Sequence, residues 1–124
     1  MHSLYFVAAG LCFILGLGHS IVGERYILLP LCRRTDLPKF FGSVELTART
    51  LRFAWHLGTV AWWGAGVIFC YMARDLLSPA IVVGVLAGVF LASAVVTFVV
   101  SRGRHFAWLL FLAIGVIALY GSQA

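Results

Sequence analysis

Four long apolar runs, separated by short polar connections, limit what this chain can fold into. They cover residues 4–22, 53–72, 80–100 and 105–121. A run of about 20 apolar residues is long enough to cross the hydrocarbon core of a bilayer as an α-helix. A helix also satisfies its own backbone hydrogen bonds in lipid. We therefore predict an all-α integral membrane protein that crosses the bilayer four times as a four-helix bundle.

The composition supports this fold class and excludes others. Hydrophobic residues make up 63% of the 124 residues and charged residues 10%, whereas soluble domains carry about 25% charged residues. Four spans use most of the chain, so we predict one transmembrane domain over residues 1–124. The net charge is +5. Because the basic residues flank the apolar runs, we expect them to contact anionic membrane lipids and not nucleic acid.

Basic residues also predict the orientation of the spans. With four spans, the first and third connections lie on one side of the membrane and the second connection on the other. The first side holds eight basic residues and the second side one: Arg25, Arg33, Arg34, Lys39, Arg49, Arg52, Arg102 and Arg104 against Arg74. Positive residues accumulate on the cytoplasmic side of inner-membrane proteins. We therefore predict a multi-pass protein of the bacterial inner membrane with both termini outside the cytoplasm.

The first connection, residues 25–42, is the longest. Residues 26–31 are mostly apolar, and the segment from Arg33 to Lys39 is polar and rich in basic side chains. A segment of this mixed character is typical of one that lies along the membrane surface, and Pro30 and Pro38 disfavour a long regular helix. The sequence leaves two readings open: an interfacial segment between helices 1 and 2, or an extension of the first helix followed by a polar loop.

Polar side chains gather at the predicted cytoplasmic end of the spans. Four of them follow one face of a helix that we expect to begin near Ser43, spaced i, i+4, i+7 and i+11: Glu45, Arg49, Arg52 and His56. At this spacing Glu45 and Arg49 can pair. With residues of the first and fourth spans, the predicted cluster is His19, Ser20, Glu24, Arg49, Arg52, His56 and His105. Polar groups at this depth are costly in lipid and mark functional sites, although anchoring of helix ends is the simpler explanation.

Three chemistries compete for this cluster, and the sequence does not decide whether the protein is an enzyme. His19 and His56 are candidate ligands for haem b or a metal ion, because neutral imidazoles on facing helices are suitable axial ligands. Proton-coupled or anion transport by an oligomer would use Glu24 or His56 as the titrating group, with Arg49 and Arg52 attracting an anion. Catalysis on a lipid or quinone headgroup would need His19 as a base. The alternative to all three is an accessory or structural subunit of a membrane complex.

Small residues recur every fourth position in two of the runs. The two stripes are Ala8, Cys12, Gly16 and Ser20 in the first run, and Ala80, Gly84, Gly88 and Ala92 in the third. Small side chains let helix backbones approach closely in lipid. The stripes therefore predict tight helix packing, either within the bundle or against a second copy or a partner membrane subunit.

The three cysteines indicate neither a disulfide framework nor a cysteine-based zinc site. Cys12 and Cys70 lie within apolar runs and Cys32 in the first connection, and no two of them form a CxxC pair. Cysteine in apolar surroundings behaves as a small hydrophobic residue.

Two segments carry a resemblance to other proteins. Residues 18–28 read GHSIVGERYIL and residues 51–56 read LRFAWH. This pattern resembles a group of small bacterial four-span inner-membrane proteins that share GHSxxGER…LRFAWH and for which no activity is known. The resemblance covers roughly the first half of the chain. It implies the same location and number of spans, and it implies no reaction.

Overall fold

The computed structural model describes residues 2–121, and in that range the chain is all-helical, as predicted. The first three elements form one continuous helix: α1 (His2–Gly23), the π-helical segment η1 (Glu24–Leu28) and α2 (Leu29–Cys32). Three separate helices follow: α3 (Val44–Met72), α4 (Pro79–Ser101) and α5 (Ala107–Gly121). Of the two readings of the first connection, the helix extension is therefore confirmed for its apolar half, which is helical to Cys32.

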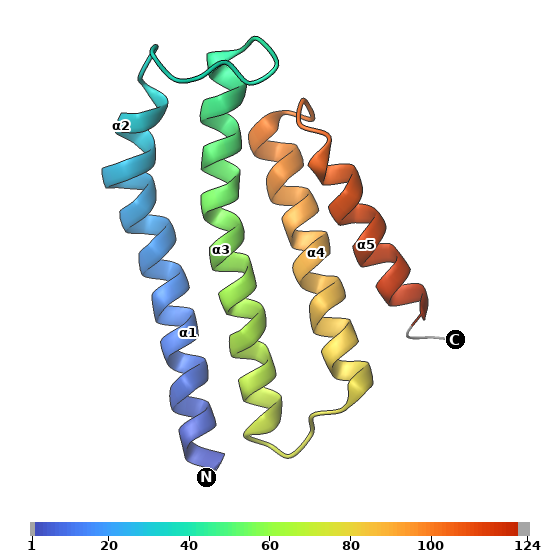
Figure 1. Cartoon of the computed structure of the whole chain (residues 1–124). Helices are drawn as coiled ribbons and strands as arrows, with labels where there is room; N and C mark the ends of the chain where they lie inside the picture. Colours follow the sequence, from blue (N-terminus) through green and yellow to red (C-terminus); the bar gives the residue numbers. More distant parts are fainter. Residues whose placement is uncertain (1, 122–124) are drawn as a thin grey trace.

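Three of these helices are long and apolar enough to cross a membrane: His2–Cys32, Val44–Met72 and Pro79–Ser101. The fourth, α5, is apolar but has 15 described residues. At a rise of 1.5 Å per residue this gives about 22 Å, less than the hydrocarbon thickness of about 30 Å. The fourth predicted span, 105–121, is shortened because the helix starts only at Ala107. Its end in Figure 1 lies short of the far end of α4.

Serine caps begin the two central helices. The hydroxyl of Ser43 accepts a hydrogen bond from the backbone N–H of Leu46 at 3.1 Å, so α3 begins where the sequence predicts it. The hydroxyl of Ser78 accepts from the N–H of Ile81 at 3.3 Å, and Pro79 follows in the first turn of α4. A side-chain acceptor at the cap satisfies a free N–H of the first turn, and proline suits that turn because its missing N–H would have no partner there.

The π-helical segment explains how the first helix passes through Pro30. Proline has no N–H to donate, and its ring clashes with the carbonyl four residues earlier in a regular α-helix. Just before Pro30, the N–H of Leu29 reaches back five residues to the carbonyl of Glu24. This wider turn relaxes the backbone ahead of the proline, and the helix continues to Cys32. Single π-turns of this kind are frequent at functional sites.

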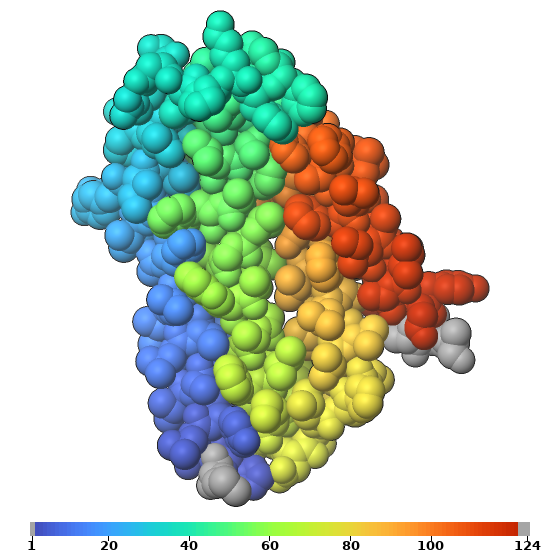
Figure 2. Space-filling model, in the orientation of Figure 1, coloured from blue at the N-terminus to red at the C-terminus, as the bar shows by residue number. Residues whose placement is uncertain are grey.

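The first helix, α3, α4 and α5 lie side by side in chain order and form an open bundle (Figures 1 and 2). The first helix packs on α3, α3 on α4, and α4 on α5. No other pair of these helices is in contact within residues 2–121. Because α1 and α4 do not meet, the face of α3 between them is not covered by any other helix of residues 2–121. This open face carries the grooves described below.

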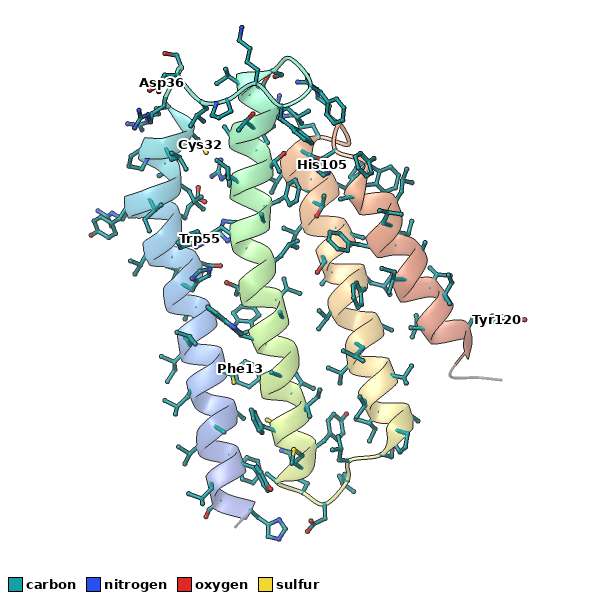
Figure 3. All side chains as sticks on the ribbon, in the orientation of Figure 1. Phe13, Cys32, Asp36, Trp55, His105 and Tyr120 are labelled. Atoms are coloured by element: carbon teal, nitrogen blue, oxygen red, sulfur yellow. The ribbon has the colours of Figure 1, made fainter. Side chains whose placement is uncertain are left out.

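Glycine and tryptophan fit together in the interface between α1 and α3. A Cβ atom at Gly16 would collide with the Trp63 ring, and one at Gly23 with the Trp55 ring. The indole N–H of Trp63 donates to the carbonyl of Phe13 at 3.2 Å, and that of Trp55 to the carbonyl of His19 at 2.9 Å. In Figure 3, Phe13 and Trp55 lie between the two helices. The small-residue stripe of the first run thus packs within the chain.

The small-residue stripe of α4 is different. A Cβ atom at Gly84 or Gly88 would meet no atom within 4 Å, so neither glycine contacts another helix of the described chain. The glycines that allow close packing on α4 lie on its neighbours. A Cβ at Gly64 of α3 would collide with Val89, and one at Gly115 of α5 would lie 2.7 Å from Leu91.

Candidate functional site

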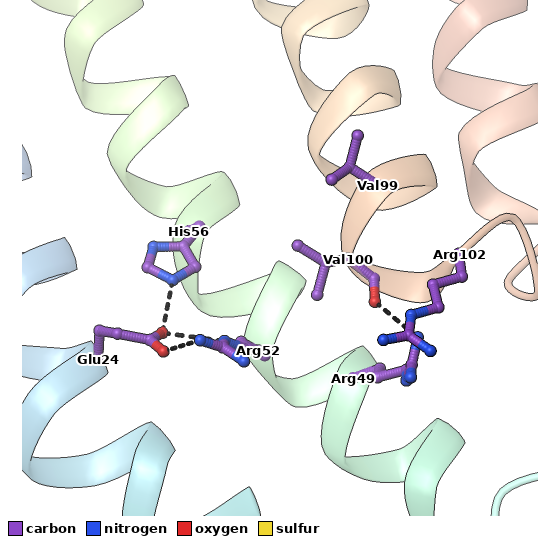
Figure 4. A pocket seen from close by; sticks show the side chains of 7 residues that line it. All are labelled: Glu24, Arg49, Arg52, His56, Val99, Val100 and Arg102. Carbon is purple, nitrogen blue, oxygen red and sulfur yellow. Dashed lines mark hydrogen bonds and ion pairs between the residues drawn. The ribbon is translucent and has the colours of Figure 1, made fainter.

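The Glu24 carboxylate joins the first helix to α3. Arg52 donates from Nε to Oε2 of Glu24 at 3.1 Å and from Nη2 to Oε1. Nε2 of His56 lies 3.0 Å from the same Oε2 atom (Figure 4). The side chains of Glu24 and His56 are 24% and 23% exposed, so the site is partly removed from solvent. A forked arginine–carboxylate contact fixes both distance and direction, and Glu24 is therefore held in one orientation.

Hydroxyl groups extend this cluster along the interface between α1 and α3. Nδ1 of His56 lies 2.9 Å from the Ser20 hydroxyl, which lies 2.6 Å from the Thr59 hydroxyl. Thr59 in turn donates to the carbonyl of Gly16 at 3.1 Å. Four consecutive contacts therefore connect the Glu24 carboxylate to the backbone of α1 more than one helical turn deeper.

The cluster forms one wall of an open pocket of about 480 Å³, which we call the polar pocket. Its lining comes from η1, α3 and the end of α4: Glu24, Arg49, Arg52, His56, Val99, Val100 and Arg102 (Figure 4). Three guanidinium groups and one carboxylate give this lining a net charge of +2 when His56 is neutral. The pocket is therefore suited to an anion.

Arg49 is already paired, as the i, i+4 spacing predicts. Its Nη2 lies 2.5 Å from Oε1 of Glu45, and its Nη1 donates to the carbonyl of Val100 at 3.5 Å. Glu45 also lies 3.4 Å from Nη1 of Arg104. These contacts tie the start of α3 to the end of α4 and to the turn that follows it. Arg49 therefore both shapes the pocket and contributes charge to it.

Arg102 is the pocket arginine without an ion pair within residues 2–121. It ends α4 in the left-handed conformation, with φ 52° and ψ 41°. The next N–H, that of Gly103, closes the turn by donating to the carbonyl of Phe98 at 2.8 Å. A non-glycine residue in this conformation costs about 1–2 kcal/mol. The turn thus accepts a strained backbone and holds a guanidinium at the pocket.

Two apolar grooves continue from the polar pocket along the uncovered face of α3. The first, about 440 Å³, shares His56, Val99 and Val100 with the polar pocket and adds mainly valines. The second, about 260 Å³, shares Val60 with the first and is lined mainly by small and branched apolar side chains of α3 and α4. Polar and apolar cavities therefore follow one another along the seam between these helices.

The structure places five of the seven predicted cluster residues together and two elsewhere. Ser20, Glu24, Arg49, Arg52 and His56 form the network and pocket just described. His19 lies at the other edge of the interface between α1 and α3. Its ring stacks on Trp55 with centroids 4.4 Å apart and an interplanar angle of 2°, and its Nε2 donates to the carbonyl of Trp55 at 3.1 Å. His19 does not line the polar pocket.

His105 caps α5 and lies in an aromatic setting. Its Nδ1 accepts a hydrogen bond from the N–H of Ala107 at 3.2 Å. Its ring stacks on Phe40 at 5.5 Å and meets the edge of Phe53 at 4.9 Å. Figure 3 shows it at the connection between α4 and α5. Burial lowers the pKa of His105 below its usual 6.5, because an apolar setting disfavours the charged ring.

The prediction of a haem or metal site at His19 and His56 finds no support in this geometry. Both ring nitrogens of His56 and Nε2 of His19 are engaged by protein atoms. In the part of the chain that the structure describes, no group of three or more His, Cys, Asp or Glu side chains could hold a metal ion. Binding at His56 would require the loss of a hydrogen bond to Ser20 or Glu24.

The predicted cluster left out two contributors to the site. Thr59 lies three residues after His56 and continues the same helix face into the membrane, but the predicted cluster ended at His56. Arg102 was assigned only to the orientation of the spans, because its left-handed backbone turns it toward the pocket and no spacing rule reveals such a turn.

Comparison with known proteins gave no match: no protein-family model, no curated protein and no solved structure is similar to the chain. The resemblance carried by residues 18–28 and 51–56 therefore stays a prediction.

Proposed function

We propose that this chain is a multi-pass protein of the bacterial inner membrane that binds an anionic group in the polar pocket, at the cytoplasmic end of its helices. The distribution of basic residues supports this orientation, because the polar pocket lies at the same end as the two arginine-rich connections. The proposal replaces haem or metal as the ligand of the cluster.

The unpaired Arg102 is the observation that carries this proposal. Arg52 forms an ion pair with Glu24, and Arg49 forms one with Glu45. Arg102 lines the same pocket and makes no ion pair within residues 2–121; Glu45, which is already paired with Arg49, acts on it only through space. Like charges held together in a partly dehydrated site repel one another, and an anion that enters removes this repulsion. Guanidinium groups also bind phosphate and carboxylate oxygens with two parallel hydrogen bonds. Anion transport would begin with this binding step.

Inorganic phosphate is the probe that tests the proposal. We would titrate it by calorimetry into the full chain, purified in an uncharged detergent, and compare Arg102→Asn with the unchanged protein. Asparagine tolerates the left-handed conformation, so the turn should keep its shape. The loss of a charge-assisted hydrogen bond of about 1.5–3 kcal/mol corresponds to a roughly 10- to 100-fold weaker affinity.

Arg74→Asn is the matched control, since it removes the same charge from the connection between α3 and α4 at the opposite end of the molecule. It should bind phosphate as the unchanged protein does. Equal affinities of the unchanged protein and Arg102→Asn would refute the assignment of the site, and so would a protein that binds no phosphate.

A further inference from the structure

The polar pocket does not end at its charged wall, and its continuation indicates what kind of anion it binds. The first apolar groove opens directly from it, sharing His56 and two valines. The second groove joins the first through Val60. A small soluble anion would make use of the charged part alone. A ligand that has an apolar part attached to its charged group would fill the apolar extension as well.

We propose that the occupant is an anionic phospholipid of the cytoplasmic leaflet, with its phosphate at Arg102 and one acyl chain in the two apolar grooves. This rests on the proposed anion site and names its ligand class. The charge of the lining selects the headgroup. Its one carboxylate, Glu24, is already paired with Arg52, so an added choline or ammonium group would find no free carboxylate in the lining and would be repelled by Arg102.

The length of the seam fits an acyl chain. From Arg52 in the polar pocket to Val67 in the second groove there are 15 residues of α3. At 1.5 Å per residue this is about 22 Å. Half the hydrocarbon thickness of a bilayer is roughly 15 Å. The seam is therefore longer than one leaflet is deep, so it is long enough to take an acyl chain along its whole length and ends beyond the middle of the bilayer.

The polar side chains that reach the grooves are already hydrogen-bonded within the protein, so they need no hydrogen bond from the ligand. The hydroxyls of Ser20 and Thr59, which reach the first groove, are hydrogen-bonded to each other and to His56 or Gly16. Gly88 and Ala92 line the second groove. Because these exposed residues of α4 have small side chains, their wall of the second groove leaves room for the acyl chain.

The stripe of α4 supplies both a blocking variant and its control. Gly88 lines the second groove, whereas Gly84, one turn away, lines none of the three cavities. A Cβ at either glycine would meet no atom within 4 Å, so both Gly88→Leu and Gly84→Leu should fold. Only Gly88→Leu places a branched side chain in the path of the acyl chain.

The experiment measures lipid retention by native mass spectrometry of the full chain, released from detergent with equal amounts of phosphatidylglycerol and phosphatidylcholine. We expect phosphatidylglycerol to be retained at least tenfold better. Gly88→Leu should lose this retention at least tenfold, while its affinity for inorganic phosphate changes less than twofold. Gly84→Leu should behave as the unchanged protein, and Arg102→Asn should lose both lipid and phosphate.

Equal retention of the two lipids would overturn the inference, and so would full retention of phosphatidylglycerol by Gly88→Leu. If phosphate binding still depends on Arg102 in such a case, the anion site stands and only its lipid assignment fails. The same spectra report the number of chains. A dimer that is lost in Gly88→Leu and retained in Gly84→Leu would mean that a second copy fills the groove, which also overturns the lipid assignment.

Discussion

Nε2 of His56 lies 3.0 Å from Oε2 of Glu24, at one end of four contacts that lead through Ser20 and Thr59 to the carbonyl of Gly16. Each contact needs one hydrogen. A neutral imidazole and two hydroxyls supply three, and an ionised carboxylate supplies none. All four contacts can be satisfied together only when the pair of His56 and Glu24 holds one more proton.

Glu24→Gln tests this hydrogen count, because the glutamine amide can itself donate to Nε2 of His56 and so supplies the missing hydrogen. The ¹⁵N resonances of the His56 ring should therefore differ between Glu24→Gln and the unchanged protein. Identical ring resonances in the two proteins would contradict the hydrogen count.

Gly23→Ala should destabilise the protein by about 1–3 kcal/mol, the usual range for overpacking. The added methyl group would collide with the indole of Trp55 and push α1 away from α3, weakening the bond from Trp55 to the carbonyl of His19. Denaturant unfolding in micelles, followed by circular dichroism, measures the change. Gly18→Ala is the control, since its Cβ would meet no atom within 4 Å. A similar loss in both variants would argue against the glycine–tryptophan fit.

Stability should fall as the pH drops below about 6.5 because of His105. In the unfolded chain this ring gains a proton near its usual pKa of 6.5, whereas burial lowers its pKa in the folded protein. Unfolding is therefore favoured by acid, increasingly so as the pH falls from 6.5 toward the lowered pKa, and is unaffected by this ring above that range. Protonation of Nδ1 would also remove the acceptor for the N–H of Ala107.

His105→Asn tests this directly, since asparagine is a good helix cap that does not titrate in this range. The loss of thermal stability between pH 7.5 and pH 5 should be smaller in this variant than in the unchanged protein. An equal loss in both proteins would mean that other groups control the acid sensitivity.

Arg102→Gly should stabilise the protein by about 1 kcal/mol, because glycine adopts the left-handed conformation without the steric penalty of a side chain. The same variant should lose phosphate binding. Unfolding and calorimetry on one preparation would record both effects. A variant that loses binding and stability together would show that Arg102 supports the fold and not a ligand.

The orientation can be tested with single cysteines in a variant lacking the three native ones. We expect Asp75→Cys, between α3 and α4, to react in intact cells with a maleimide that cannot cross the membrane. Asp36→Cys, between α2 and α3, should react only after the cells are made permeable. The reverse pattern would place the polar pocket on the outer side.

The length and spacing of apolar residues sufficed to predict the helices, because those features act within a single element. The start of α3 at Ser43 and the pairing of Glu45 with Arg49 followed from local rules and are confirmed. The different positions of His56, in the polar network, and His19, outside it, could not be predicted from such rules. His19 and Ser20 are adjacent and so point about 100° apart on the helix. The rotation of α1 about its axis decides whether His19 or Ser20 faces the polar network on α3. No local sequence pattern specifies that rotation.

The shape of the bundle was also beyond a sequence argument. The small-residue stripes of α1 and α4 have the same spacing. Trp63 packs over Gly16 in the first stripe, whereas no described side chain packs over Gly88 in the second. Which stripe is used depends on the large residue opposite it. The strained turn at Arg102 could not be predicted either, since nothing in a run of arginine and glycine indicates that the arginine takes a positive φ as well as the glycine that follows it.

The arrangement of the helices in chain order has a consequence for how the molecule is made. Because each long helix contacts only the helices adjacent to it in the described chain, every interface can form as soon as its second helix leaves the ribosome. No early helix has to wait for a late one, and short separations between contacting residues favour rapid folding. Biosynthesis can therefore proceed by adding one helix at a time to the growing edge. Translation arrested after α3 should already yield the paired Glu24 and Arg52.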